Sequence, residues 1–313
     1  MPTPHTTLPI RRLTTADVAS CADLAEDRGW AREEPRWRFL LTAGAGYGIT
    51  EPEGEGLAAT CVVSSYGPLH EPSCGPASST SSTSSTGDDR PGPPRGRGLV
   101  AVGMLLVAGR HARQGLGRRL MTHVLHEAGD TPLALYATSY GRPLYQQLGF
   151  TDAGGVERVR GHFRSPDRAP RVTTRPATAQ DLPALVRLDA EVLGVDRTHM
   201  IARLPSSTDR IRVAEEGSTI TGFAAAWSTP ETEVVGPLIA RDTETAKALL
   251  SSLATCSDRP TRVDIDTRHK ELLNWVKEHG LETNVLTTVM VHGIPDLPGD
   301  RTRSFAPLSL ATG

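Results

Sequence analysis

Residues 101–120 read AVGMLLVAGRHARQGLGRRL, and the hydrophobic pattern of the chain changes within this stretch. The run from Val102 to Val107 is apolar enough for a buried strand. From Gly115 onward, Leu116, Leu120 and Val124 recur at helical spacing. A strand that turns through glycines into a helix presents unpaired backbone N–H groups and the positive end of the helix at one point. The stretch therefore predicts an anion site that suits a pyrophosphate.

The two glycines narrow the kind of phosphate site. Gly115 and Gly117 let the backbone approach a phosphate where a Cβ would obstruct it. The segment has no Gly-Lys-Ser/Thr of a nucleotide P-loop and no GxGxxG of a dinucleotide fold, because Arg118 and Arg119 follow the second glycine. It resembles motif A of the GNAT N-acetyltransferases, Arg/Gln-x-x-Gly-x-Gly/Ala, whose loop holds the pyrophosphate of acetyl-CoA. Ala112 departs from the first position of that motif, and an ordinary strand–loop–helix is the alternative interpretation of the segment alone.

A second motif follows at the expected distance. After a short apolar strand over 133–137, residues 138–150 read TSYGRPLYQQLGF. This resembles the family's motif B, in which a helix carries Leu-Tyr-x-x-x-Gly-Phe, and it places the tyrosine at Tyr145. The resemblance implies that Tyr145 is the general acid that protonates the departing CoA thiolate. A phenol with a pKa near 10 is protonated at neutral pH and can donate to a thiolate, although an amphipathic packing residue is the plainer interpretation of a tyrosine on such a helix.

The resemblance implies a set of residues that bind acetyl-CoA, the co-substrate. They are the strand residues Leu105, Leu106 and Val107, the loop residues Arg113, Gln114, Gly115, Leu116, Gly117 and Arg118, and Thr138 after the next strand. A backbone N–H near Leu105 or Leu106 would polarise the thioester carbonyl, and a neutral amine would attack it directly.

The general base is not assigned by these motifs. Many relatives have a glutamate on the strand that precedes the loop, but residues 103–106 contain none. Three carboxylates are candidates: Glu33 and Glu34 in a tryptophan-rich segment, and the terminal carboxylate at Gly313. For Glu33 and Glu34, a solvated surface carboxylate is the plainer interpretation.

Composition excludes several classes of protein. The net charge of the 313 residues is −2, which predicts no nucleic-acid partner. The apolar runs are shorter than the ~18 residues that cross a membrane, and the first residues, MPTPHTTLPIRR, contain no hydrophobic signal core. The four cysteines lie far apart without a CxxC, and His123 and His126 lack the i, i+4 spacing of a metal pair. We therefore expect a cytoplasmic protein that has no metal site and does not bind membranes.

The order of elements predicts two tandem domains of one fold class, α/β. Each is expected to be GNAT-like, with a mixed, mostly antiparallel sheet flanked by helices. The catalytic domain is predicted over residues 1–165 and contains an insertion, 66–97, whose Ser, Thr, Gly and Pro content predicts disorder. A degenerate domain is predicted over 171–313, because Thr174–Leu182 echoes Ile10–Asp17 and the strand and helix order then repeats. In place of the CoA loop this domain has VGPLIARD over 235–242, where Pro237 removes a backbone donor.

The acceptor is the least determined part of the prediction. Chains with two GNAT-like domains resemble actinobacterial antibiotic acetyltransferases of the capreomycin acetyltransferase type. The resemblance implies acetylation of a primary amine of a small molecule, such as an amine-bearing peptide antibiotic, for self-resistance. Trp30, Trp37 and Trp227 are candidates either for the acceptor pocket or for the core. Two alternatives remain open, a protein-lysine acetyltransferase and a non-catalytic acetyl-CoA-binding sensor.

Overall fold

The computed structural model describes residues 8–51, 56–69, 98–167 and 171–313. The elements of the first half are β1 (Ile10–Leu13), η2 (Thr15–Asp17), α1 (Val18–Asp27), α2 (Glu34–Ala43), β2 (Ala45–Thr50), β3 (Leu57–Tyr66), β4 (Leu99–Val107), η3 (Gly109–His111), α3 (Leu116–Ala128), β5 (Leu133–Ala137), α4 (Arg142–Gln147) and β6 (Thr151–Gly161). Those of the second half are β7 (Thr174–Pro176), η4 (Ala179–Asp181), α5 (Leu182–Leu193), α6 (Thr198–Ile201), α7 (Leu204–Ser207), β8 (Arg210–Glu216), β9 (Thr219–Ser228), β10 (Glu233–Ala240), α8 (Thr243–Ala254), β11 (Thr261–Asp266), α9 (Lys270–Glu278), β12 (Glu282–His292) and β13 (Ser304–Ala306).

The two halves begin alike, as the echo in the sequence predicts. Each starts with a short strand that leads into a capping box, in which Thr14 is paired with Asp17 in the first half and Thr178 with Asp181 in the second. In both boxes the aspartate carboxylate accepts a hydrogen bond from the main-chain N–H of the threonine, and the main-chain N–H of the aspartate donates to the carbonyl of the threonine. This reciprocal bonding fixes the start of the first helix in each half.

The strands of both halves form one continuous sheet, and each half contributes a strand to the other. The order is β1-β2-β3-β4-β5-β12-β6-β11-β10-β9-β8-β7, with β13 paired to β10. Thus β12 of the second half lies between β5 and β6, while β6 of the first half lies between β12 and β11. The predicted fold class is confirmed, and the predicted division near residues 165–171 falls between β6 and β7. The exchange ties the two halves together along the backbone hydrogen bonds of the middle strands.

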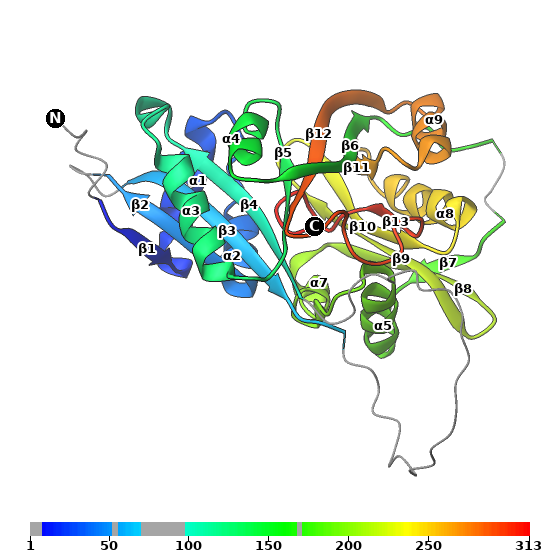
Figure 1. The fold of residues 1–313 in the computed structure, drawn as a ribbon. Coiled ribbons are helices and arrows are strands. Elements are labelled where there is room, and N and C mark those ends of the chain that lie inside the picture. Colours follow the sequence, from blue (N-terminus) through cyan, green and yellow to red (C-terminus); the bar gives the residue numbers. More distant parts are fainter. Residues whose placement is uncertain (1–7, 52–55, 70–97, 168–170) are drawn as a thin grey trace, which may run out of the picture.

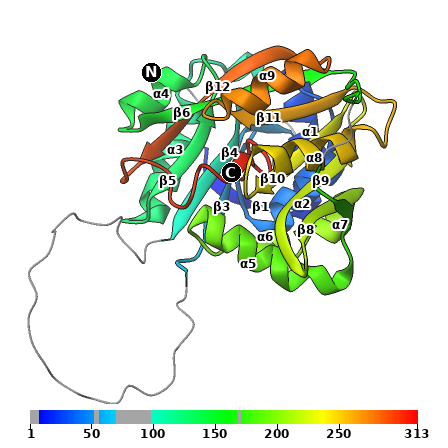
Figure 2. The same ribbon diagram turned by 90° about the vertical axis from the view of Figure 1, so that its right-hand side faces the viewer.

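Helices cover both faces of the sheet. On the first half, α3 packs on β3 and β4, and buried residues of α3 and α4 share one apolar cluster. The helices α1 and α2 lie on the opposite face with a second cluster. Figures 1 and 2 show the second half arranged in the same way, with α5 and α8 on either side of its strands.

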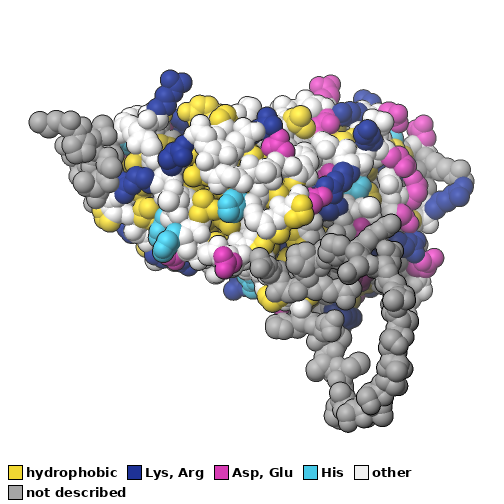
Figure 3. Space-filling model, viewed as in Figure 1, with side chains coloured by type: hydrophobic (Ala, Val, Ile, Leu, Met, Phe, Trp, Pro, Cys, Tyr) yellow, Lys and Arg dark blue, Asp and Glu magenta, His cyan; other side chains and the backbone are white. Residues whose placement is uncertain are grey.

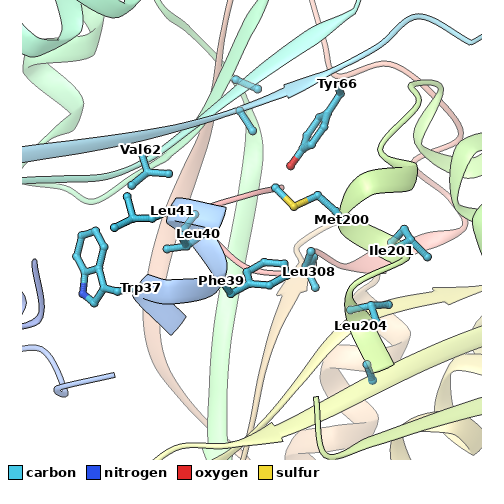
Figure 4. Packing of buried hydrophobic residues seen from close by; sticks show 14 of the residues in the cluster. Trp37, Phe39, Leu40, Leu41, Val62, Tyr66, Met200, Ile201, Leu204 and Leu308 are labelled. Atoms are coloured by element: carbon cyan, nitrogen blue, oxygen red, sulfur yellow. The ribbon is translucent and has the colours of Figure 1, made fainter. Parts of the chain in front are cut away.

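The cluster beneath α2 also joins the two halves. Trp37, Leu40 and Leu41 of α2 are buried beside β3, and Phe39 lies next to Leu308 (Figure 4). Met200, Ile201 and Leu204 from α6 and α7 belong to the same cluster. Because these residues are nearly free of solvent contact, the apolar core extends across the boundary between the halves.

The segment 66–97, predicted to be disordered, is described only at its beginning. Tyr66 ends β3, is 5% exposed and donates a hydrogen bond from its hydroxyl to the main-chain oxygen of Thr312. Gly67 forms a bridge with Asp196. The strand therefore runs further than predicted, and residues 70–97 lie outside the described residues.

Candidate functional site

A bulge in β4 distorts the strand that precedes the glycine loop. The pairing of β4 with β3 shifts register between Thr60 and Val62, opposite Leu106 and Gly103. Met104 has a φ of 51°, which non-glycine residues adopt only under local constraint. The Thr60 hydroxyl, which is buried, donates to the main-chain oxygen of Met104 at 3.0 Å and holds this carbonyl in place. A bulge re-aims the amides that follow it, so the N–H groups near Leu105 leave the regular ladder.

The loop after β4 ends in a helix N-terminus without a side-chain cap. Gly115 is the N-cap residue of α3, with a φ of 81°, and a Cβ built on it would meet nothing within 4 Å. The Arg119 amide donates to the carbonyl of Gly115 at 3.0 Å, which is the first bond of the helix. The amides of Leu116, Gly117 and Arg118 therefore have no acceptor within the helix. The open cradle and the positive helix end suit an anion.

The side chains of the loop divide into two groups. Arg113 is exposed and has a φ of 62°. Arg118 donates instead to the side chain of Gln147 on α4, and Gln114 donates to the carbonyl of Arg110 at 3.3 Å. Both arginines belong to the predicted CoA-binding set; among the described residues, the Arg113 side chain forms no hydrogen bond or ion pair, whereas that of Arg118 is already bonded.

Tyr145 lies on α4, against the same face of the sheet as α3. It is 8% exposed and packs against Phe150, with the two ring centroids 5.9 Å apart. Burial raises the pKa of Tyr145 well above its ordinary value, and the nearby Cys61 acts in the same direction. The phenol is therefore a proton donor at neutral pH. Thr138 caps the turn before α4 by accepting from the amide of Gly141 at 3.2 Å.

The strands β4 and β5 separate next to this site. They pair in parallel over Val100–Val102 and Leu133–Leu135, and no pairing continues beyond Val102. On the opposite face from Tyr145, residues 304–313 run between the two halves (Figures 1 and 2). A Cβ built on Gly103 would lie 2.5 Å from the Cα of Ala311, so only a glycine lets this segment lie against the bulge. The segment thus forms the wall of the site on that face.

A small, mostly apolar cavity of about 50 Å³ lies between this wall and the sheet. Its polar lining includes Tyr136 of β5 and the buried pair of Asp266 with Arg301. Arg197 also lines it, binding both oxygens of Asp189 at 2.8 Å. Both halves therefore contribute to the space on this face of β4 and β5.

The three carboxylate candidates for the base lie in different places. Glu34 is held by Arg32 at 2.9 Å within a cluster of exposed charges. Glu33 is half-buried at the N-cap of α2. Gly313 is half-buried, and its main-chain oxygen accepts from Arg197 Nη1 at 2.6 Å. Of the three positions, only 313 borders the cavity next to β4.

The corresponding junction of the second half, β10 to α8, is closed by its own residues. The segment predicted to replace the CoA loop, 235–242, is mostly strand, because β10 continues to Ala240. Asp242 caps α8, and its Oδ1 accepts from the amide and the hydroxyl of Thr245, both at 2.8 Å. The strand β13 pairs with β10 at Leu238 and Ile239 and lies next to β11.

Two features of the site were not predicted from the sequence: the role of Thr60, and the course of the 304–313 segment, of which only Gly313 was named, as a candidate base. Thr60 carries no motif, and its role depends on a bulge that the pairing of β3 with β4 creates. The 304–313 segment has an irregular pattern, and nothing in its sequence indicates that it reaches β4. The apolar side chains of Phe305, Ala306 and Leu308 are the one feature of its sequence that indicates burial.

Metal sites and membrane spans are both absent from the described ranges, 8–51, 56–69, 98–167 and 171–313. His, Cys, Asp and Glu side chains there nowhere gather in a group of three or more that could hold a metal ion. Every helix in these ranges is too short or too polar to span a bilayer.

Comparison with known proteins bears on both halves. Residues 95–165, which include both motifs, match a family model described as an acetyltransferase (GNAT) domain. Residues 185–306 match a second model with the same description. The chain is 28% identical over 185 residues to YitH, an uncharacterized N-acetyltransferase of Bacillus subtilis (strain 168). That match covers 58% of this chain and 66% of YitH, just under two thirds of its length.

Solved structures share the fold over nearly the whole chain. A crystal structure of a Pyrococcus horikoshii protein superposes with a TM-score of 0.72 at 16% identity, covering 98% of this chain and 96% of the other. A tandem GNAT protein from the clavulanic acid biosynthesis pathway superposes with a TM-score of 0.60 at 12% identity, covering 92% and 99%. At these identities the likeness shows the fold. Each half therefore contains a region, 95–165 in the first and 185–306 in the second, that matches a GNAT acetyltransferase domain.

Proposed function

We propose that the protein is an N-acetyltransferase that moves the acetyl group of acetyl-CoA to a primary amine of a small molecule. One observation carries this proposal. The bulge at Met104, the uncapped helix start at Gly115 and the buried phenol of Tyr145 lie around the point where β4 and β5 separate. These are the parts that direct acyl transfer requires: an anion cradle, a donor for the oxyanion, and an acid.

Each part of the chain has one task in this reaction. The amides of Leu116, Gly117 and Arg118 bind the pyrophosphate of the co-substrate, and Arg113 adds charge. An N–H near Leu105 or Leu106 donates to the thioester oxygen as it becomes an oxyanion. The amine nitrogen forms the new bond to the carbonyl carbon, the carbon–sulfur bond breaks, and the Tyr145 hydroxyl gives its proton to the sulfur. Positioning supplies most of the rate, since little covalent chemistry falls to the protein.

The amine must lose a proton before or during the attack. Glu33, Glu34 and the carboxylate that the chain would carry at Gly313 are the candidates for the base. The hydrogen bonds of Glu34 to Arg32 disfavour it. Gly313 lies beside the cavity next to β4, which favours it, but the bond from Arg197 to its main-chain oxygen disfavours it in the same way as Glu34. For the acceptor, an amine-bearing peptide antibiotic of the capreomycin type is the candidate that the two-domain organisation suggests.

A non-catalytic acetyl-CoA sensor is the second candidate. It is favoured by the contact of Ala311 with Gly103, which covers the bulge on the face opposite Tyr145. A protein-lysine acetyltransferase needs an open groove for a peptide. The 304–313 segment and the second half cover the face opposite Tyr145, where such a groove would lie. We therefore place it behind both.

Thiol release from acetyl-CoA tests the proposal. A panel of peptide antibiotics, aminoglycosides, polyamines and a lysine peptide would be assayed with the wild-type chain and with Tyr145→Phe. Loss of the acid is expected to lower kcat about 100- to 1,000-fold and to leave the affinity for acetyl-CoA unchanged. Tyr140→Phe is the matched control, because Tyr140 precedes the same helix and is 72% exposed.

The results separate the candidates. Turnover that Tyr145→Phe does not slow would remove Tyr145 from the mechanism. Tight binding of acetyl-CoA without turnover of any amine would favour the sensor. Acetylation of the lysine peptide alone would favour the protein-lysine enzyme.

A further inference from the structure

Arg36 lies between the two halves with an unusual set of partners. It belongs to α2, and its guanidinium is 5.0 Å from the ring centre of Trp227 on β9 and 5.5 Å from that of Phe39. Aromatic faces stabilise a cation but leave the N–H groups in the guanidinium plane unused. Within the described residues the buried Nη2 of Arg36 has no hydrogen-bond partner. A buried donor in this state is uncommon and calls for an acceptor.

A second arginine of this region is in the same state. Arg262 Nη2 and Arg158 Nε bind the two oxygens of Asp264, at 2.8 and 2.7 Å. Asp264 is 5% exposed, so one buried carboxylate serves two arginines. The Nε of Arg262 is buried and, in the part of the chain that the structure describes, has no partner. Both oxygens of Asp264 therefore already accept hydrogen bonds, while N–H donors of Arg36 and Arg262 have no acceptor among the described residues.

The charges of this cluster do not balance. Arg36, Arg158 and Arg262 bring three positive charges, against which stand Asp264 and, at the start of α2, Glu33. Burial lowers the pKa of Arg36 to about 10; Glu33 and Asp264 oppose this lowering, and Arg262 adds to it. Arg36 is therefore still protonated at neutral pH. The surface differs: on the face drawn in Figure 3, acidic and basic side chains of the second half lie next to one another.

The cluster lies near the 304–313 segment, which forms a wall of the proposed site. Tyr66 lies within electrostatic range of Arg36, and its hydroxyl binds the carbonyl of Thr312. The preceding residue, Ala311, is the one that lies against Gly103 in the bulge of β4. Phe39, which stacks on Arg36, and Leu308 of the same segment point toward each other (Figure 4). Through Phe39 and Tyr66, the cluster is thus linked to the segment that lies against the bulge of β4.

We propose that Arg36 and Arg262 bind an acidic group of the acceptor, so that the acceptor is an amine that also carries a carboxylate or a phosphate. This inference rests on the proposed function and specifies its substrate class. An arginine with free edge donors recognises either oxyanion through paired N–H···O bonds. It disfavours a purely cationic acceptor, because a second positive charge would be repelled here.

Matched pairs of amines test the inference by thiol release. L-Lysine is compared with 1,5-diaminopentane, which lacks the carboxylate, and phosphoethanolamine with ethanolamine, which lacks the phosphate. For the wild type, kcat/KM is expected to favour the acidic member of at least one pair about 10- to 100-fold, and the pair that shows it identifies the oxyanion. Arg36→Gln and Arg262→Gln should each bring that ratio close to one, by lowering kcat/KM of the acidic member much more than that of the member without the acidic group.

Arg38→Gln is the matched control, since Arg38 is exposed on the same helix. A wild type that turns over both members of each pair equally would overturn the inference and leave the acetyltransferase proposal intact. Equal loss for both members in Arg36→Gln would also overturn it, because that is what a structural role predicts.

If none of these four amines is acetylated, the binding of simple anions tests the inference instead. Glutarate and inorganic phosphate at constant ionic strength should raise the melting temperature of the wild type more than that of Arg36→Gln. An equal rise in both proteins would overturn the inference. Binding of acetyl-CoA, titrated in parallel, reports on the proposed function independently.

Discussion

The junction of β4 with α3 and the junction of β10 with α8 have the same topology and opposite properties. In both, a strand with a bulge runs parallel to its neighbour, separates from it and leads into a helix. Gly115 begins α3 and leaves the amides of the first turn open, whereas Asp242 begins α8 and fills that place with its own carboxylate. The first junction presents an anion site, and the second has an anion built in.

The strands differ in the same sense. Thr60, opposite Leu106, holds the bulge of β4, while Ala224 stands opposite Leu238 in the second half and has no hydroxyl to donate. Beyond the bulge, β13 lies along β10, where β4 has no added strand. A GNAT fold can therefore be kept as a scaffold when the chain itself supplies what a ligand would. We infer that the chain binds one acetyl-CoA, in its first half.

Gly115→Asp makes the first junction like the second and should have the largest effect. An aspartate tolerates the left-handed conformation better than most residues, and its carboxylate would bind the open amides. Loss of two or three charge-assisted hydrogen bonds of about 1.5–3 kcal/mol each predicts an affinity for acetyl-CoA that is about 1,000-fold weaker. Isothermal titration calorimetry measures it.

The reciprocal variant, Asp242→Gly, is the control for that experiment. It opens the first turn of α8 but leaves β13 in place, so the stoichiometry should stay at one acetyl-CoA per chain. A second binding event in Asp242→Gly would show that the carboxylate alone had closed the second site, and the role given to β13 would then be wrong.

Phe305→Ala addresses β13 itself. Phe305 is 1% exposed and stacks on His269 at 3.9 Å between ring centres. Its truncation should lower the free energy of unfolding by about 3 kcal/mol, since a buried phenyl group is lost and a cavity is left. Urea unfolding checks this value. Unchanged stability would mean that β13 is not fixed in the separation between β10 and β11.

Much of the fold, and part of the site, could be predicted from the sequence. Apolar runs located the strands over 102–107 and 133–137, and the glycines of residues 115–117 with the helical spacing after them marked the helix start. The exchange of β6 and β12 could not be predicted, because either strand has the same apolar pattern whichever neighbour it joins. The contact of Ala311 with Gly103 and the cluster at Arg36 depend on that exchange, since they join residues of different halves.

Thr60→Val isolates the bulge. Valine has the shape of threonine without the hydroxyl, so the Met104 carbonyl would lose its donor at a position that is fully buried. We expect kcat to fall about tenfold, equivalent to about 1.4 kcal/mol, with the affinity for acetyl-CoA unchanged. Ala224→Val alters the equivalent place in the second half and should leave kcat unaffected. Equal kinetics for the wild type and Thr60→Val would separate the bulge from catalysis.

The two capping boxes offer the smallest effect and a test of equivalence between the halves. Arg11 donates to Asp17 through one nitrogen at 2.6 Å, whereas Arg175 donates to Asp181 through two, at 2.8 and 2.9 Å. Hydrogen bonds from Arg11 and Arg175 are the main reason that the pKa values of Asp17 and Asp181 lie below their usual range. A lowered folded pKa contributes stability that is present above the unfolded value, about 3.9, and is lost as the pH falls through the folded value.

Asp181→Asn should therefore destabilise the protein by about 1 kcal/mol at pH 7, and Asp17→Asn by less, because each replaces bonds to a charged acceptor by weaker ones. Both differences should stay constant down to about pH 5, begin to shrink as the pH falls below about 4, and be smaller at pH 3, because the wild-type chain loses this contribution between the unfolded and the lowered folded pKa. Urea unfolding at pH 7, 5 and 3 measures them, with exposed Asp130→Asn as the control. A difference that stays constant with pH would mean that the aspartates act through their shape rather than their charge. Equal effects of the two variants would mean that the second nitrogen of Arg175 adds nothing to the cap, and that the two helix starts are energetically as well as structurally alike.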